Sequence, residues 1–236
     1  MLLLKKIGNR NQANREIWLQ NAIKNIPKGN KILDAGAGEL QYKKFCEHLN
    51  YTSQDFGKYD GQGDEGSHPG KWDNSKLDIV SDITNIPVET ESFDAVMCIE
   101  VFEHIPEPIK AVKEFSRIIK KGGTLIITAP FCSMTHFAPY HFYTGYNKYW
   151  YEKILVENGF EITDLQYNGN YFEYLAQEMR RLPEMAKKYA KINPFILILL
   201  KILIKFNLLF LHIFSNRDSN SKEMLSYGLH VKAIKK

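Results

Sequence analysis

Short apolar runs alternate with stretches of helical period along most of the chain. A short run rich in Val, Ile and Leu predicts a strand buried on both faces, whereas apolar residues that recur every three or four positions predict an amphipathic helix. The predicted strands are 31–36, 51–56, 77–80, 94–99, 124–128, 160–167 and 227–234. The predicted helices are 9–25, 40–48, 107–120, 147–158 and 194–214.

Strands that alternate with helices predict a parallel sheet covered by helices on both faces. We therefore expect an α/β fold: a Rossmann-like, seven-stranded, mostly parallel sheet whose last strand is antiparallel, with a helical insertion before that strand. The 236 residues fit one domain over 1–236, with the insertion at 168–226. In such sheets ligands bind beyond the carboxyl ends of the strands, near the first crossover.

A glycine-containing turn follows the first predicted strand. Gly36 and Gly38 are separated by one residue, and glycine is needed where a ligand approaches the backbone or where φ is positive. The helix predicted after the turn would present free N–H groups to a bound anionic group. A dinucleotide-binding turn carries a third glycine at the position where this chain has Gln41. The sequence therefore argues against an NAD-dependent oxidoreductase.

Four acidic residues stand at or near the carboxyl ends of the first four predicted strands. Because parallel strands end at the same edge of a sheet, we expect these side chains to converge. Together they would attract a cationic sulfonium and repel a pyrophosphate. The alternative is that each acid is a solvated loop residue or a helix cap. The four acids are Asp34, Asp55, Asp82 and Glu100.

Four segments between about residues 30 and 167 resemble the class I S-adenosylmethionine (SAM)-dependent methyltransferase superfamily. They are DAGAGE at 34–39, SDITNIP at 81–87, FDAVMCIEVFEHIPEP at 93–108 and RIIKKGGTLIITAP at 117–130. The resemblance implies an enzyme that uses SAM as its cofactor. It further implies that Asp34, Gly36 and Gly38 line the methionine and the backbone turn, Asp55 binds the ribose, Asp82 and Ile83 flank the adenine, and Glu100 lies on the methionine side.

The acceptor side is expected in 131–151, a polar and aromatic segment after the fifth strand. This segment, with the glycine-rich loop 57–76, resembles a subgroup of methyltransferases found among enzymes of cell-surface polysaccharide biosynthesis, which implies a small-molecule, glycan or lipid-linked acceptor. Aromatic rings stack on planar groups, and a histidine can deprotonate an acceptor hydroxyl. The candidate bases are His104, His136 and His141. Each has a structural role as its alternative, and proximity alone can drive methyl transfer; we expect His136 or His141 to be needed for turnover.

Other partners and chemistries are argued against. The net charge is only +4 and the sequence shows no strong basic stripe, so we expect no nucleic-acid partner. The histidines and acids lack a familiar metal-ligand spacing, so we expect no metal site. Three widely spaced cysteines indicate reduced thiols, and the start of the chain does not have the pattern of a signal peptide, which favours a cytoplasmic protein. A SAM-binding scaffold without catalysis is the alternative function, and such a scaffold would not need all four acids.

The predicted insertion contains an apolar helix at 194–214. It would be about 31 Å long, enough to cross a bilayer core, but Lys201, Lys205 and His212 form one polar stripe along it. An odd number of crossings conflicts with the return of the last strand to the sheet. Three interpretations are left: a helix in the membrane interface, a helix buried in a homodimer, or a cover over the domain. The first would place the protein peripherally at the inner face of the membrane.

Overall fold

The computed structural model describes residues 7–63, 66–67 and 70–236. The predictions for the start of the chain, and for positions 64–65 and 68–69 of the glycine-rich loop, lie outside the described residues. The chain divides into two compact units. One contains Ile17–Gln166 and Gly228–Lys236, and the other contains Tyr167–Tyr227 with the described residues up to Glu16.

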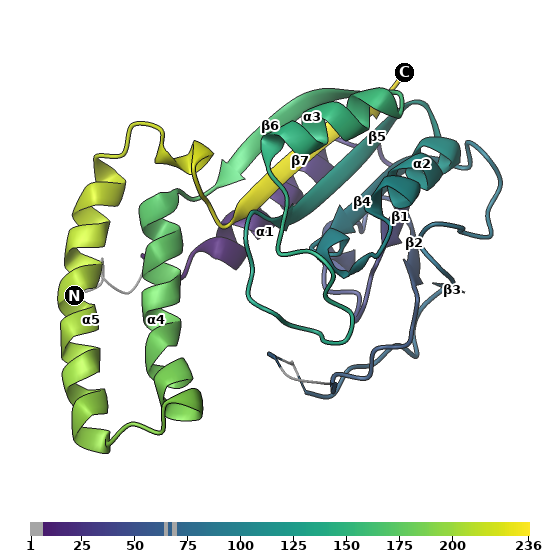
Figure 1. The fold of residues 1–236 in the computed structure, drawn as a ribbon. Coiled ribbons are helices and arrows are strands. Elements are labelled where there is room, and N and C mark those ends of the chain that lie inside the picture. The colour runs from purple at the N-terminus through teal and green to yellow at the C-terminus, as the bar shows by residue number, and fades with distance from the viewer. Residues whose placement is uncertain (1–6, 64–65, 68–69) are drawn as a thin grey trace. The chain divides into compact units, whose positions relative to one another are not determined.

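The first unit is built on a seven-stranded sheet (Figure 1) in the order β3-β2-β1-β4-β5-β7-β6. The strands from β1 to β5 are parallel to their neighbours, and β7 runs antiparallel to β5. The predicted fold class is confirmed. The strands are β1 (Lys31–Ala35), β2 (Asn50–Asp55), β3 (Ile79–Val80), β4 (Phe93–Ile99), β5 (Ile119–Pro130), β6 (Phe160–Asn168) and β7 (Gly228–Lys235).

The central strands are buried on both faces, as their nearly continuous apolar sequences predict. In β4 every residue except Asp94 is buried. The longest strand, β5, begins five residues earlier than the predicted strand, directly at the end of α2. Its register against β4 shifts between Phe93 and Ala95, so its first part pairs with the sheet across a bulge.

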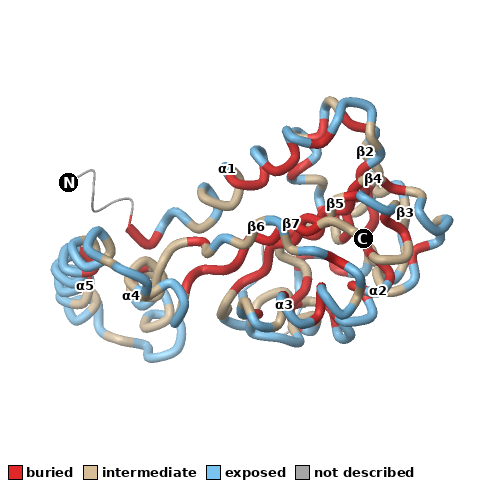
Figure 2. The backbone as a smooth tube through the Cα atoms, turned by 90° about the horizontal axis from the view of Figure 1, so that it is seen from above, coloured by how far each residue is buried: buried red, intermediate tan, exposed pale blue. Residues whose placement is uncertain are grey.

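Helices cover both faces of this sheet (Figure 2), with α1 on one face and α2 and α3 on the other. Trp18, Leu19 and Ile23 of α1 pack with Ile32 of β1 and Met97 of β4 in one buried cluster. The apolar face of each helix therefore pairs with one face of the sheet, which is the condition for a stable layer. The helices are α1 (Asn11–Lys24), α2 (Pro108–Ile118) and α3 (Lys148–Glu157).

The helix predicted at 40–48 is wrong. Within residues 36–49, all of which are described, the structure has turns and one short 3-10 helix, η2 (Lys43–Phe45). Gly36, Gly38 and Leu40 all have positive φ, and left-handed residues this close together prevent the hydrogen-bond ladder of an α-helix. The glycine turn is therefore not followed by the helix N-terminus that the sequence suggested.

The second unit is built on two long helices, α4 (Tyr171–Tyr189) and α5 (Pro194–Asn216). They bury a small cluster that includes Ala176 of α4 and Ile204, Leu208 and Leu211 of α5. The sequence placed one apolar helix at 194–214 and did not separate α4 from the rest of the insertion. By length and composition alone, α5 is long and apolar enough to cross a membrane.

Candidate functional site

The glycine turn after β1 is fixed by the neighbouring strand β2. Gly36 and Ala37 both donate their N–H groups to the carbonyl oxygen of Gln54, at 2.8 and 2.9 Å. The φ values of Gly36 and Gly38 are 81° and 48°, a region that side chains with a Cβ rarely adopt. A Cβ at Gly36 would also lie 2.5 Å from Val101. The turn needs glycine for its backbone and for its packing.

Asp55, the last residue of β2, ties this turn to the second strand. Its Oδ2 accepts the N–H of Gly38 at 3.1 Å, and its Oδ1 accepts the N–H of Gly57 at 2.9 Å. The carboxylate is buried. It therefore lies directly beside the glycine turn, at the carboxyl ends of β1 and β2, as the sequence predicts.

Asp34 lies inside the sheet and is only 2 % exposed. Its Oδ2 accepts a hydrogen bond from the hydroxyl of Tyr51 at 2.7 Å. Burial is the main cause that raises the pKa of Asp34 to about 7. The charge of Asp55 raises this pKa further, whereas the hydrogen bond from Tyr51 lowers it. This carboxyl group is therefore tied to the first part of β2, through a contact with Tyr51 that no local sequence pattern predicts.

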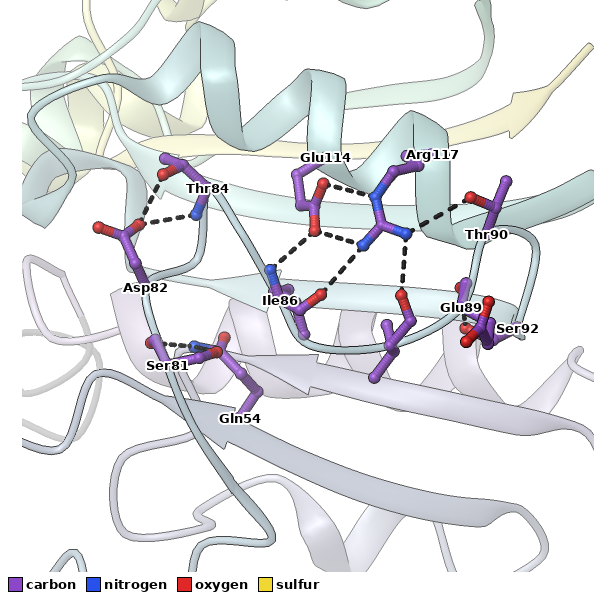
Figure 3. Close-up of polar contacts among 11 residues, drawn as sticks. Gln54, Ser81, Asp82, Thr84, Ile86, Glu89, Thr90, Ser92, Glu114 and Arg117 are labelled. Carbon is purple, nitrogen blue, oxygen red and sulfur yellow. Dashed lines mark hydrogen bonds and ion pairs between the residues drawn. The ribbon is translucent and has the colours of Figure 1, made fainter.

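Asp82 and Ile83 follow β3, at the start of a segment that α2 holds against the sheet (Figure 3). Asp82 is exposed and its Oδ1 accepts the N–H and the hydroxyl of Thr84 at 2.8 and 2.7 Å. Further along, the guanidinium of Arg117 donates to the carbonyls of Ile86 and Val88 and to the buried carboxylate of Glu114. These bonds fix the path of 81–92, so Asp82 and Ile83 are held beside the end of β3.

Glu100 directly follows β4 and has a φ of 56°, which is uncommon for a residue with a side chain. Its N–H donates to the Thr128 carbonyl at 2.8 Å, and its Oε1 accepts the Thr128 hydroxyl, also at 2.8 Å. Strained backbone of this kind concentrates at functional sites. The two bonds to β5 hold Glu100 at the same edge of the sheet as Asp55.

Three histidines and one buried glutamate form a cluster next to these acids. Glu103 and His104 belong to the short 3-10 helix η3 (Phe102–His104) after β4, and His136 and His141 belong to the loop after β5. The ring centres of His104 and His136 are 4.7 Å apart, and those of His136 and His141 are 4.9 Å apart. Oε1 of Glu103 lies 3.7 Å from Nε2 of both His104 and His136.

The members of this histidine cluster differ in their affinity for protons. Burial lowers the pKa of His104 and of His141 below the usual value for histidine. Burial also acts to lower the pKa of His136, but the hydrogen bonds to Glu103 and to the Met134 carbonyl, with the charges of Glu103 and Glu100, together outweigh it and raise the pKa of His136. The pKa of Glu103 is lowered, because burial, which alone would raise it, is outweighed by His136 and His104. Near neutral pH the rings of His104 and His141 are therefore held in the neutral form, whereas His136 keeps a proton more readily.

An aromatic layer from the two long loops packs against the glycine turn. A Cβ at Gly38 would lie 2.5 Å from the Trp72 ring. Trp72 in turn contacts Tyr59 and Phe137, with ring centres 5.8 and 5.3 Å away. The two loops also pair through their backbones, since Ser67 donates its N–H to Thr135 and accepts the N–H of Phe137. The described residues of loop 57–76 therefore form one layer with loop 131–146 over this edge of the sheet.

The structure brings most of the predicted site residues to one edge of the sheet. Asp55, Glu100 and the histidine cluster lie beside the glycine turn, whereas Asp34 is buried beneath it. Sequence reasoning missed Glu103 and Trp72 as members of the site. Glu103 stands in the quoted motif next to His104, but its burial depends on loops that are distant in sequence.

Comparisons with known proteins bear on the family and the fold of the chain. Residues 33–127 match the family model described as a methyltransferase domain. The chain is 42% identical over 40 residues to the ubiquinone biosynthesis O-methyltransferase of Xanthomonas oryzae. The matched segment covers 17% of this chain and 17% of that protein. It is also 30% identical over 112 residues to the tRNA (carboxymethyluridine(34)-5-O)-methyltransferase of Arabidopsis thaliana. This match covers 45% of this chain and 25% of that protein. The matches therefore span a quarter or less of these relatives' own lengths.

A solved structure has the same fold over nearly the whole chain. It is a SAM dependent methyltransferase from Archaeoglobus fulgidus, with a TM-score of 0.56 and 16% identity over 94% of this chain and 93% of that chain. The matched domain confirms the family resemblance, and the structural likeness confirms the fold. Residues 33–127 therefore carry a methyltransferase domain, in a fold that the chain shares with a SAM-dependent methyltransferase.

Proposed function

We propose that the chain binds SAM at the carboxyl edge of β1, β2 and β4 and transfers its methyl group to an oxygen or nitrogen of a small-molecule, glycan or lipid-linked acceptor. One observation carries the proposal: the Asp55 carboxylate, bonded to the glycine turn, lies at the same sheet edge as Glu100 and the histidine cluster. Residues that could bind the cofactor and residues that could transfer a proton thus lie at the same edge of the sheet. In this view residues 168–226 are an insertion into a single catalytic domain.

The residues at this edge fit a nucleoside that carries a cationic sulfonium. Each oxygen of Asp55 accepts one N–H in the structure, so each keeps a lone pair for a ribose hydroxyl. Asp55, Glu100 and Glu103 make the edge acidic, which favours a positive charge over a phosphate. Asp82 and Ile83 would flank the adenine, and Asp34 would hold the turn through Tyr51. When bound, SAM supplies an electrophilic methyl group.

His141 fits the role of general base for the acceptor. The Ser133 hydroxyl donates its one proton to the Thr144 carbonyl at 2.9 Å, so Nε2 of His141 donates to Ser133 and Nδ1 carries a lone pair. The lowered pKa of His141 keeps this ring neutral at neutral pH. The neutral ring can remove a proton from an acceptor hydroxyl or ammonium group. His136 lies beside His141 in the same cluster.

The acceptor class is supported by the aromatic layer. Trp72, Phe137 and Tyr140 are half-buried around the buried Tyr59, and rings of this kind stack on sugar faces or planar aromatic groups. The two curated relatives are named as O-methyltransferases, of a ubiquinone precursor pathway and of tRNA. We favour a hydroxyl acceptor on a glycan or other small molecule, because the chain carries only a mild net charge of +4.

Calorimetric titration with S-adenosylhomocysteine tests the cofactor proposal. We expect binding by the wild type, no binding of NADH, and a loss of about tenfold or more for Asp55→Ala, since hydrogen bonds to a charged group contribute about 1.5–3 kcal/mol. Asp60→Ala is the matched control, because Asp60 bonds only within its own loop in the described structure. A folded wild type that does not bind S-adenosylhomocysteine would overturn the proposal.

Turnover separates an enzyme from a scaffold that only binds SAM. In an acceptor screen with SAM, we expect methyl transfer by the wild type and a loss of about 10²–10⁴-fold in a His136→Ala/His141→Ala variant that still binds S-adenosylhomocysteine. If the double variant turns over normally, neither histidine serves as the base. If the wild type binds the cofactor and transfers no methyl group to any acceptor tested, the scaffold alternative is favoured.

We further propose that α5 lies in a membrane interface, which would make this cytoplasmic protein peripheral to the inner face of the membrane. The supporting observation is a wide apolar surface: eleven large apolar side chains of α5, from Phe195 to Phe214, are 37–67 % exposed. Lys187, Lys188 and Lys191 stand just before the helix, where each basic residue near an anionic surface contributes about 1 kcal/mol. In the chain α5 is joined to β6 through α4 and to β7 through η4 (Ser221–Glu223), so a single crossing does not fit the connections.

Sedimentation with phosphatidylglycerol vesicles at low salt tests this placement. Leu203 and Phe206 lie on the exposed surface of α5, so Leu203→Glu and Phe206→Glu should abolish sedimentation. Leu182→Glu changes an exposed residue of α4 and should leave sedimentation unchanged. Light scattering of the same variants tests the homodimer alternative. A dimer that Phe206→Glu dissociates, together with no vesicle binding by the wild type, would contradict the membrane proposal.

A further inference from the structure

Glu103, His104 and His136 bring three metal-ligating groups to one point at the carboxyl edge of β4. The candidate ligand atoms, one from each residue, all lie within 4.8 Å of one another. Two of these separations, from Oε1 of Glu103 to each Nε2, are 3.7 Å. A tetrahedral ion with ligands at about 2.1 Å places its ligand atoms about 3.4 Å apart. Two of the three separations are therefore close to the value that an ion requires, and the third is at most 4.8 Å.

The hydrogen bonds of the two rings point the correct nitrogen at the glutamate. Nδ1 of His104 bonds the carbonyl of Tyr140, and Nδ1 of His136 bonds the carbonyl of Met134 at 2.8 Å. A carbonyl only accepts, so both Nδ1 atoms carry the hydrogen, and in the neutral rings both Nε2 atoms carry lone pairs. Metal-ligating histidines are characteristically oriented by such a bond from the other ring nitrogen.

The glutamate lacks the partners that a buried carboxylate needs. Glu103 is 1 % exposed, and its Oε2 has no hydrogen-bond partner. Its Oε1 faces two imidazole nitrogens, and two lone pairs that face a carboxylate repel it unless a cation lies between them. One proton on His136 satisfies one of these contacts. A divalent ion satisfies Oε1 and both nitrogens together, and offers a partner to Oε2 as well.

We propose that Glu103, His104 and His136 bind one divalent transition-metal ion of the zinc type. Two imidazoles and one carboxylate suit such ions, whereas Mg²⁺ prefers oxygen ligands alone. Three protein ligands leave a coordination position open. The use of the ion rests on the proposed methyl transfer: the open position would hold an acceptor hydroxyl and lower its pKa. His136 is then a ligand, and His141 is left as the base.

The spacing of these residues explains why the sequence predicted no metal site. Glu103 and His104 are adjacent, but His136 follows 32 positions later than His104 in a loop of another strand. Familiar zinc motifs place two ligands on one helix or one turn. Here the ligands meet only because β4 and β5 are neighbours in the sheet and both end at this edge.

Direct metal binding tests the proposal independently of methyl transfer. The full chain, without a histidine tag and stripped with a chelator, is titrated with Zn²⁺ by calorimetry, and the bound metal is counted by elemental analysis. We expect one Zn²⁺ per chain, no heat with Mg²⁺, and binding weakened by about tenfold or more in Glu103→Gln, His104→Ala and His136→Ala. His48→Ala is the matched control, because the His48 ring precedes β2 and bonds the carbonyl of Ile26, between α1 and β1.

The same samples are titrated with S-adenosylhomocysteine, which shows that each variant is folded and tests the cofactor site separately. Zn²⁺ binding without cofactor binding would refute the proposed function and retain the metal site. Cofactor binding by a wild type that takes up no Zn²⁺ would overturn the metal site alone. Zn²⁺ binding that all three variants retain at full strength would also overturn it.

Discussion

The hydroxyl of Tyr51 donates a hydrogen bond to Oδ2 of Asp34 at 2.7 Å, inside the sheet and beneath the glycine turn. Because Asp34 is fully buried, this bond does not offset the cost of its charge, and its pKa is raised to about 7. The folded protein therefore holds the protonated form of Asp34 at pH values where an unfolded chain would release the proton. Because the folded and the unfolded protein bind this proton differently, the free energy of unfolding depends on pH.

Asp34→Asn should remove that dependence. A raised pKa contributes stability that is complete below the unfolded value of 3.8 and is lost as the pH rises to about 7. The free energy of unfolding of Asp34→Asn, relative to the wild type, should therefore increase with pH in this window by up to about 1.4 kcal/mol per unit. Denaturant unfolding at several pH values measures it.

Asp94→Asn is the matched contrast. Burial alone would raise the pKa of Asp94, but Lys120 and the N–H of Lys31 outweigh it and lower this pKa. The stability of this variant relative to the wild type should therefore change with pH in the opposite direction. A flat curve for Asp34→Asn would show that Asp34 titrates as an ordinary carboxyl group, and a curve equal to that of Asp94→Asn would show that its pKa is lowered.

Gly38→Ala should destabilise the folded protein by roughly 1–3 kcal/mol, because its φ is 48° and its new Cβ would meet the Trp72 ring at 2.5 Å. The second cause can be isolated with Trp72→Ala. In a double-mutant cycle followed by thermal unfolding, the double variant should lose less stability than the sum of the single variants. Strict additivity would mean that the ring moves away freely.

Trp72 should report cofactor binding through its fluorescence, since its ring packs on the residue whose N–H bonds Asp55. Addition of S-adenosylhomocysteine should change the emission of the wild type and of Trp150→Phe, and should leave that of Trp72→Phe unchanged. Trp150 is a fair comparison because it packs among Phe102, Tyr146 and Tyr151. A full signal in Trp72→Phe would place the cofactor away from this ring.

Arg117→Met should cost roughly 3–5 kcal/mol of stability, because it leaves the buried carboxylate of Glu114 without its charged partner. The control is Lys153→Met, which removes an exposed ion pair with Glu157 and should cost at most about 0.5 kcal/mol. Thermal unfolding compares the two. Similar losses would mean that Arg117 does not hold the segment after β3.

The sheet could be predicted from the sequence because its strands are marked locally. The apolar run of β4 and the turn residues around it identify a buried strand without any knowledge of its neighbours. The positions of Asp55 and Glu100 follow from that, since both directly end or follow a strand. The error at 40–48 arose because apolar spacing cannot reveal that Leu40 is left-handed.

The rest of the site depends on contacts between segments that are far apart in the chain. Trp72 reaches Gly38 only because loops 57–76 and 131–146 pair with each other. Glu103 becomes buried only when His136 packs over it from the loop after β5. Neither contact has a local signature, so sequence reasoning identified the histidines singly and could not find the group they form.

The segment that carries α4 and α5 leaves and rejoins the chain at one place, where Tyr227 donates its N–H to the carbonyl of Asn168 at 2.9 Å. Its two stems are therefore tied together like the ends of a closed loop. A segment attached in this way can be lengthened, replaced or lost while β6 and β7 keep their places in the sheet. The exposed apolar surface of α5 can thus be exchanged without moving the strands whose ends carry the glycine turn, Asp55 and Glu100.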